Sequence, residues 1–279
     1  MLMKSMWRMI YPFALLFLMG GVMAADDITK TYEFEGIHSI KIVTKKGNVE
    51  FRSGDQKNLV VSLRNELEHP DELIPKINST GGVLIFHEEF KNESQTGNVF
   101  WTFILPKDPL ELDIESIECT SGSGKIALYG INSRTLDFTS AVGEISLTGG
   151  RAEKIDLTTS TALISVEGFE IIKKADIVSA TNDIRISLPH LPAKMFSAVS
   201  TLGEIILEVP SFGSDFDLTM EKKANKGEIV SPFSCMDKEI RHSNDENNAK
   251  EYCFIKQGKG GPKIELATST GKIVISTSE

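Results

Sequence analysis

The sequence has little of what enzymes and nucleic-acid-binding proteins usually need. Only 8% of its 279 residues are aromatic, and no basic cluster alternates with them. The formal net charge of −9 at pH 7 disfavours nucleic acid and anionic lipid as partners. The five histidines follow no repeat, and the chain has no nucleophile elbow, phosphate-binding loop or metal signature. We therefore predict no catalytic residue, cofactor or metal site, although carboxylates distant in sequence could still converge in a folded enzyme.

Cysteine is also scarce, with three residues in the whole chain. Cys119 falls at an inward-facing position of a strand, where a free thiol behaves as a small hydrophobic group. Cys235 and Cys253 lie toward the two ends of a polar insertion, and no zinc-binding spacing is present. In an exported protein these two cysteines can form a disulfide that ties down a long loop. The alternative is a pair of free, partly buried thiols.

Long hydrophobic runs are absent except at the N-terminus. Lys4 and Arg8 precede an uncharged run from Met9 to Ala25 that ends in small residues, which predicts a signal peptide over residues 1–24. A run of 17 residues is also at the lower limit for a membrane-spanning helix, so an uncleaved anchor is the alternative. We expect an exported mature chain, periplasmic or at the cell surface. It has no transmembrane segment, and the loss of Lys4 and Arg8 takes its net charge from −9 to −11.

The chain does contain one short pattern that returns five times between residues 117 and 209. Its centres are Gly124, Gly143, Ala162, Asn182 and Gly203, at steps of 19, 19, 20 and 21 residues. Apolar residues lie seven and five positions before each centre and two and four after it. This spacing of two is typical of strands with one buried face. Seven positions before the centres are Ile117, Leu136, Ile155, Ala175 and Phe196, and five before them are Cys119, Phe138, Leu157, Ile177 and Ala198. Two positions after the centres are Ile126, Ile145, Ile164, Ile184 and Ile205, and four after them are Leu128, Leu147, Val166, Ile186 and Leu207.

Each copy therefore predicts a strand, a tight turn and a second strand. Glycine or asparagine at four of the five centres suggests a turn residue with positive φ, and Ala162 departs from that pattern. A unit this small cannot bury its apolar face alone, but stacking successive units about 4.8 Å apart gives a continuous core. We predict an all-β fold, a single-stranded and right-handed β-solenoid. The alternative is an antiparallel sandwich with evenly spaced hairpins.

The rest of the chain extends this body, so residues 25–279 are predicted to form one domain. Residues 30–112 form its irregular first part, with a loop over 64–82. A sixth copy with a longer turn has Gly227 at its centre, and the polar insertion covers 231–263. A closing repeat over 264–275 ends the pattern.

Two columns of polar residues recur in the repeats. Hydroxyls stand three positions before the centres, at Ser121, Ser140, Thr159, Ser179 and Ser200, with Thr44 and Thr268 in the outlying copies. They are expected to bond the turn backbone, or else to form a polar strip that binds glycan. Carboxylates stand six positions before the centres, at Glu118, Asp137, Asp156 and Asp176. They predict a solvated face, or else a ladder that attracts divalent cations or a basic partner, although calcium needs more oxygens than one ladder supplies.

These repeats resemble those of a bacterial family labelled "putative adhesins", whose biochemical function is not established. The resemblance rests on the Ser/Thr-x-x-Gly-x-Ile turns, as in residues 121–126, and on Leu105-Pro106-Lys107 ahead of Leu112-Asp113-Ile114. It covers roughly residues 35–279 and implies a β-helix-like solenoid at the cell envelope. The family has no established catalytic residues, so none is transferred.

We therefore expect an exported, non-enzymatic β-solenoid that acts as an adhesin or binding surface for an unknown protein or glycan. One alternative is a periplasmic structural or scaffold protein that self-associates end to end through uncapped repeats. The other is a carbohydrate-active β-helix enzyme, which would need carboxylates converging in a cleft.

Overall fold

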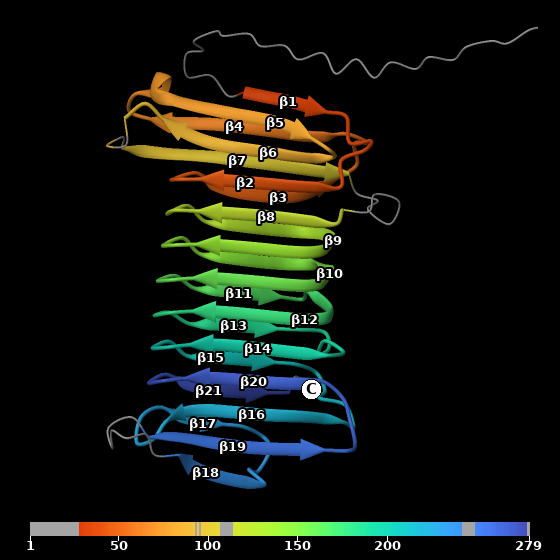
Figure 1. The fold of residues 1–279 in the computed structure, drawn as a ribbon, viewed down its shortest axis with the longest axis vertical. Coiled ribbons are helices and arrows are strands. Elements are labelled where there is room, and N and C mark those ends of the chain that lie inside the picture. Colours follow the sequence, from red (N-terminus) through yellow and green to blue (C-terminus); the bar gives the residue numbers. More distant parts are fainter. Residues whose placement is uncertain (1–27, 93, 95, 107–113, 242–248, 278–279) are drawn as a thin grey trace, which may run out of the picture.

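The chain folds into one tall stack of strands (Figure 1). The computed structural model describes residues 28–92, 94, 96–106, 114–241 and 249–277. The predicted signal peptide, residues 1–24, lies outside these ranges. The described residues form a 21-stranded sheet without an α-helix, which confirms the all-β prediction. None of their helical segments is long and apolar enough to cross a membrane. The elements are β1 (Ile28–Tyr32), β2 (Ser39–Thr44), β3 (Asn48–Gly54), β4 (Leu59–Leu67), the 3-10 helix η1 (Pro70–Glu72), β5 (Leu73–Thr80), β6 (Val83–Phe90), β7 (Gly97–Pro106), β8 (Ser116–Ser121), β9 (Ile126–Ser140), β10 (Ile145–Thr159), β11 (Ile164–Glu167), β12 (Glu170–Ser179), β13 (Ile184–Ser187), β14 (Met195–Ser200), β15 (Ile205–Glu208), β16 (Phe216–Lys223), β17 (Glu228–Val230), β18 (Asp237–Arg241), β19 (Lys250–Gln257), β20 (Lys263–Thr268) and β21 (Lys272–Ser276).

The sequence repeats stack in parallel and in register. Ile126 aligns with Ile145, Ile145 with Ile164, and Ile164 with Ile184. On the other side of the turn, Leu136 aligns with Ile155 and Ile155 with Ala175. The antiparallel sandwich is therefore wrong for these repeats, and the arrangement is consistent with a solenoid.

The stack has two broad faces. The first face carries, in spatial order, β5, β6, β2, β8, the C-terminal halves of β9 and β10, then β12, β14, β20, β16, β19 and β18. The second face carries β1, β4, β7, β3, the N-terminal halves of β9 and β10, then β11, β13, β15, β21 and β17. β9 and β10 each run from the second face round a corner onto the first, which explains their length of 15 residues.

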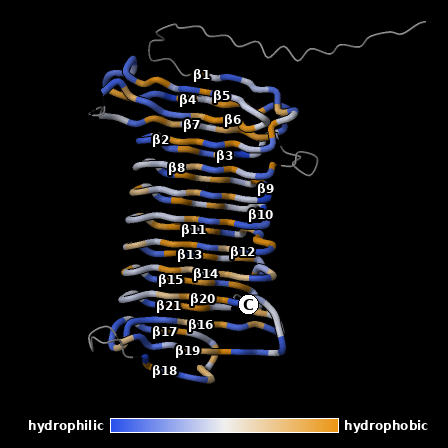
Figure 2. The backbone as a smooth tube through the Cα atoms, in the orientation of Figure 1, coloured by the Kyte–Doolittle hydropathy of each residue, from blue (hydrophilic) through white to orange (hydrophobic). Residues whose placement is uncertain are grey.

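The core lies between the two faces and runs the length of the stack. The alternation of apolar and polar residues along each strand is visible in Figure 2, and the inward members of the regular repeats are almost fully buried. Each large aliphatic side chain buried in this way contributes about 1.5–3 kcal/mol. At the N-terminal end aromatic rings fill the core instead, where Phe51 stacks on Phe103 and Phe138 with ring centroids 5.3 and 5.7 Å apart.

At the N-terminal end the spatial order departs from the chain order. β2 pairs with β6 on one side and with β8 on the other, and β3 pairs in the same way with β7 and β9. β6 and β7 therefore lie nearer the N-terminal end of the stack than β2 and β3, although they come later in the chain. The loop predicted over residues 64–82 is wrong, because β4 continues to Leu67 and β5 covers residues 73–80. Pro75 favours a loop in the sequence, but proline is tolerated on an edge strand. Among the described strands, β5 pairs with β6 alone and is such an edge strand.

The C-terminal end is reordered in the same way. The closing repeat, β20 and β21, lies between the fifth copy (β14 and β15) and the sixth (β16 and β17). The insertion is not a plain loop, because it contains β18 and β19, and β19 pairs antiparallel with β16. Antiparallel strands thus cover the first face at both ends and the second face at its β1 end.

The glycines at the repeat centres do not serve the purpose that the sequence suggested. Gly124, Gly143 and Gly203 are absent from the positive-φ residues of the described chain. Their backbones instead lie against the preceding repeat. A Cβ built on Gly143 would lie 2.0 Å from the carbonyl oxygen of Gly124, and one on Gly124 would lie 1.9 Å from that of Gly47. Close backbone approach, and not φ, is the reason for glycine; only Gly227 in the sixth copy has a positive φ, of 68°.

Candidate binding surface

The hydroxyl column is internal and bonds the turn backbone, which is the first of the two roles expected from the sequence; the alternative, a glycan-binding strip, is wrong. Its members, Ser121, Ser140, Thr159, Ser179 and Ser200, are only 1–2% exposed. Each accepts a hydrogen bond from the backbone N–H three residues later, as Ser140 Oγ does from Gly143 at 2.8 Å. The bond is shortest where the centre is glycine and lengthens to 3.3 and 3.2 Å at Ala162 and Asn182. The column therefore holds the turns together and is not available to a ligand.

Charged residues close this column at its two ends. The register of β6 on β2 places Glu88 beside Thr44, where it is 1% exposed. Glu88 Oε1 accepts hydrogen bonds from the backbone N–H groups of residues 45, 46 and 47 at 2.9–3.1 Å, and Oε2 accepts one from Trp101 Nε1 at 3.0 Å. At the other end Lys222 aligns with Thr268. Donors satisfy both oxygens of the Glu88 carboxylate, so Glu88 has a structural role and is not a free catalytic acid.

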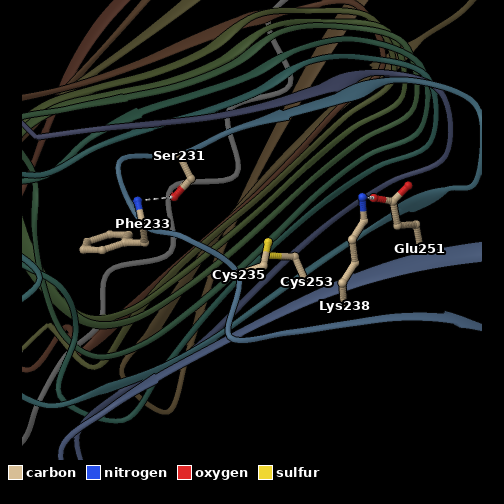
Figure 3. Close-up of a disulfide and its surroundings, with 6 residues drawn as sticks. All are labelled: Ser231, Phe233, Cys235, Lys238, Glu251 and Cys253. Carbon is tan, nitrogen blue, oxygen red and sulfur yellow. Dashed lines mark hydrogen bonds and ion pairs between the residues drawn. A yellow bond between two sulfur atoms is a disulfide. The ribbon is translucent and has the colours of Figure 1, made fainter.

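Lys222 belongs to an ion-pair cluster beside the disulfide. Its Nζ lies 2.7 Å from Glu251 Oε2. The second pair joins Lys238 Nζ to Glu251 Oε1 at 2.6 Å, and Figure 3 shows it next to the disulfide. Hydrogen bonds from these two lysines lower the pKa of Glu251. The structure joins Cys235 to Cys253, with Cα atoms 5.4 Å apart, and thereby ties β19 to the segment before β18. Cys119 is free and buried, and its burial raises its thiol pKa, so it is not a reactive nucleophile.

The acidic column lies on the outside of the first face. Glu118 aligns with Asp137, Asp137 with Asp156, and Asp156 with Asp176. Lys41 bonds Glu118 at 2.9 Å, and Lys174 lies 3.4 Å from Asp176. Lys41 also acts on Asp137, and Lys174 on Asp156, but partial burial and the neighbouring carboxylates outweigh them. The pKa of each of these two aspartates is therefore raised, by burial first and by the adjacent carboxylates second.

The acidic column does not form a metal site. Across the described ranges no group of three or more histidine, cysteine or acidic side chains is placed to hold a metal ion. The carboxylates stand in a single line on an exposed face, which cannot surround a divalent cation with the six to eight oxygens that calcium requires.

A different surface gathers aromatic, basic and hydroxyl side chains. Three adjoining shallow hollows lie on the second face over β4, β7, β3 and β9. Five residues each line two of the three hollows: Glu50, Arg52, Phe100, Thr102 and Tyr129. We call this surface the aromatic groove. The largest hollows have volumes of about 400 Å³. The other lining residues include Thr29, Ser62, Arg64 and Lys125.

Two arginine–aromatic pairs stand in this groove. The Arg64 guanidinium lies 4.3 Å from the centroid of the Phe100 ring, and that of Arg52 lies 5.8 Å from the Tyr129 ring. Glu50 pairs with Arg52 Nε, and Glu66 with Arg64 Nε at 3.1 Å. Tyr129 is 38% exposed, a large value for an aromatic side chain on a sheet face. The groove thus presents ring faces next to both donors and acceptors.

The sequence analysis missed the aromatic groove. Its residues come from β4, β7, β3 and β9, whose adjacency depends on the reordering at the N-terminal end. One signal was present: Phe100 and Tyr129 alternate with buried Val99, Trp101 and Leu128, so their rings face outward.

Comparison with known proteins gives a family. The model of the Toastrack family DUF4097 matches residues 27–276. No curated protein matches the chain. Solved structures with similar folds include a "putative adhesin" from Bacteroides fragilis (12% identity, TM-score 0.47, covering 91% of this chain and 98% of that one) and a "putative cell adhesion protein" from Clostridium sporogenes (13%, 0.40, 91% and 99%). A "putative lipid binding protein" from Parabacteroides distasonis is also similar (11%, 0.31, 90% and 97%). Likenesses this distant carry no functional argument, but the family match spans most of the sequence. The chain belongs to the Toastrack family DUF4097.

Proposed function

We propose that the chain is an exported, non-enzymatic β-solenoid of the bacterial cell envelope that acts as a binding or adhesion surface. In this proposal the 19–21-residue repeats form a right-handed coil after removal of residues 1–24. The partner is a protein or glycan surface, and nucleic acid is disfavoured by the net charge of −11 that remains without Lys4 and Arg8.

The aromatic groove is the observation that carries this proposal. Exposed aromatic rings flanked by arginines are enriched at recognition surfaces, where they supply contact area together with directional hydrogen bonds. The groove lies on a continuous sheet, so its side chains are held by a rigid scaffold and little ordering is needed on binding.

Cell-surface exposure is tested by protease treatment of intact cells. Lys238 and Arg241 in β18 are exposed and are cleavage sites for trypsin. Both lie between Cys235 and Cys253, so the fragments stay joined until the disulfide is reduced. The gel must therefore be run under reducing conditions and probed with an antibody to residues 231–263.

Cleavage on intact cells, with a periplasmic marker protected, is the expected result. Protection until the outer membrane is opened would overturn the adhesin proposal and favour a periplasmic scaffold. The non-enzymatic part is tested separately by incubating the purified chain with polysaccharides, where release of new reducing ends would contradict it.

A further inference from the structure

We infer that the aromatic groove binds an uncharged oligosaccharide chain, an inference that rests on the proposed binding function and names its ligand. Aromatic rings carry negative charge on their faces, which attracts the weakly positive C–H groups on the flat side of a pyranose ring. An arginine lies over one side of each of the Phe100 and Tyr129 rings. The hollow that both rings line is lined by neither arginine, so each ring offers its other face there.

The spacing of the two rings suits a chain of several sugars. The register aligns Phe100 with Asn48 and Tyr129 with Arg52, so the two aromatics are four residues apart along the strands and two strands apart across the sheet. With about 3.3 Å per residue and 4.8 Å between strands, their Cα atoms are separated by roughly 16 Å along a diagonal. Glu50, Thr102 and Ala127 lie between them, so an extended ligand meets hydroxyl and carboxylate groups on its way from one ring to the other.

The polar groups suit hydroxyls better than a formal charge. A sugar hydroxyl both donates and accepts, and the groove offers both partners: Glu50 accepts, the guanidiniums of Arg52 and Arg64 donate, and Thr102 does either. Each arginine is engaged through Nε by a glutamate, which balances the charge and leaves its terminal amino groups as donors. Lys125 is likewise paired with a glutamate, Glu144, at 3.1 Å. An anionic ligand would therefore meet Glu50, cations that are already paired, and a mature chain with a net charge of −11.

The test is isothermal titration of the purified chain with cellohexaose, maltohexaose and chitohexaose, and with an oligogalacturonate of equal length as the acidic probe. We expect at least one neutral hexasaccharide to bind. Phe100→Ala and Tyr129→Ala are each expected to weaken binding about tenfold, the size of one lost aromatic contact. Tyr129→Phe keeps the ring and should bind like the wild type.

Tyr252→Ala is the matched control. The Arg241 guanidinium lies 4.8 Å from the centroid of the Tyr252 ring, so this pair resembles the two in the groove. Tyr252 lies on β19, at the opposite end of the stack. This variant should bind as the wild type does, and circular dichroism should show all variants folded.

Three results would overturn the inference: binding of neutral sugars unaffected by Phe100→Ala and Tyr129→Ala, binding of the oligogalacturonate alone, or binding of no saccharide. The proposed function fails separately. If no saccharide binds but cells still attach through the chain, the sugar inference is wrong and the adhesin proposal stands; if cells do not attach through it either, both are wrong.

Discussion

Replacing Ser140 by alanine should destabilise the stack because it removes an acceptor from a buried turn. Ser140 is 1% exposed, and its Oγ accepts the Gly143 N–H at 2.8 Å and lies 3.4 Å from the carbonyl oxygen of Gly124 in the preceding repeat. Without the hydroxyl, the Gly143 N–H is buried without a partner. A buried donor left unsatisfied costs about 1–3 kcal/mol, and we expect the free energy of unfolding to fall by this amount.

The assay is urea denaturation followed by circular dichroism, with hydrogen exchange at the Gly143 amide as a local reading. Thr148→Ala is the matched control, since Thr148 lies in the same repeat, on the strand β10 that follows the turn, and is exposed. Its effect should stay within about 0.5 kcal/mol. Thr159→Val should cost less than Ser140→Ala, because its bond to Ala162 is already 3.3 Å long. A loss for Ser140→Ala no greater than for Thr148→Ala, with unchanged exchange at Gly143, would refute the reasoning.

Three further changes test other parts of the stack. Gly143→Ala places a Cβ 2.0 Å from the Gly124 carbonyl oxygen, so thermal or urea unfolding should show a loss of about 1–3 kcal/mol, and a loss no larger than that of Ala162→Gly would contradict close backbone packing. Asp156→Asn removes a like charge from the acidic column and should raise the unfolding free energy at pH 7 by about 0.2–1 kcal/mol. The folded-state pKa of Asp156 is raised, so wild-type stability increases as the pH falls through it, and the advantage of the variant should disappear near pH 3; lower stability at pH 7 would count against the repulsion. Reduction of the Cys235–Cys253 bond, or Cys235→Ser with Cys253→Ser, releases a loop of 18 residues and should destabilise the β18–β19 hairpin by about 3 kcal/mol. Hydrogen exchange should then speed up there and not in residues 117–209, and equal acceleration in both would contradict a local role.

The regular repeats were predictable because their spacing repeats position by position. Inward residues such as Ile145 and Leu147 lie two apart, and each copy meets the same position of its neighbour, so sequence period and spatial register carry the same information. The glycine centres were located correctly but explained wrongly. Glycine is needed at these centres because the backbone lies against the carbonyl of Gly47 or Gly124 in an adjacent repeat, a contact that no local sequence pattern reveals.

The two ends were less predictable because their strands do not stack in chain order. β6 and β7 lie outside β2 and β3, and the last copy returns to lie beside the fifth. These placements depend on long-range pairing and on the antiparallel strands that cover the ends. The aromatic groove depends on the first of these reorderings, which brings Phe100 beside residues of β3, so its site could not be assembled from the repeat pattern alone.

The most direct test of the proposed function is the attachment of cells to a surface coated with a neutral polysaccharide. It compares a strain lacking the chain with the same strain carrying the wild-type chain, the double variant Phe100→Ala with Tyr129→Ala, or the control Tyr252→Ala. We predict that deletion lowers attachment, that the wild-type chain and the control restore it, and that the groove variant does not. Equal attachment of the deletion strain and the wild-type strain, on this coating and on a protein coating, would contradict the account.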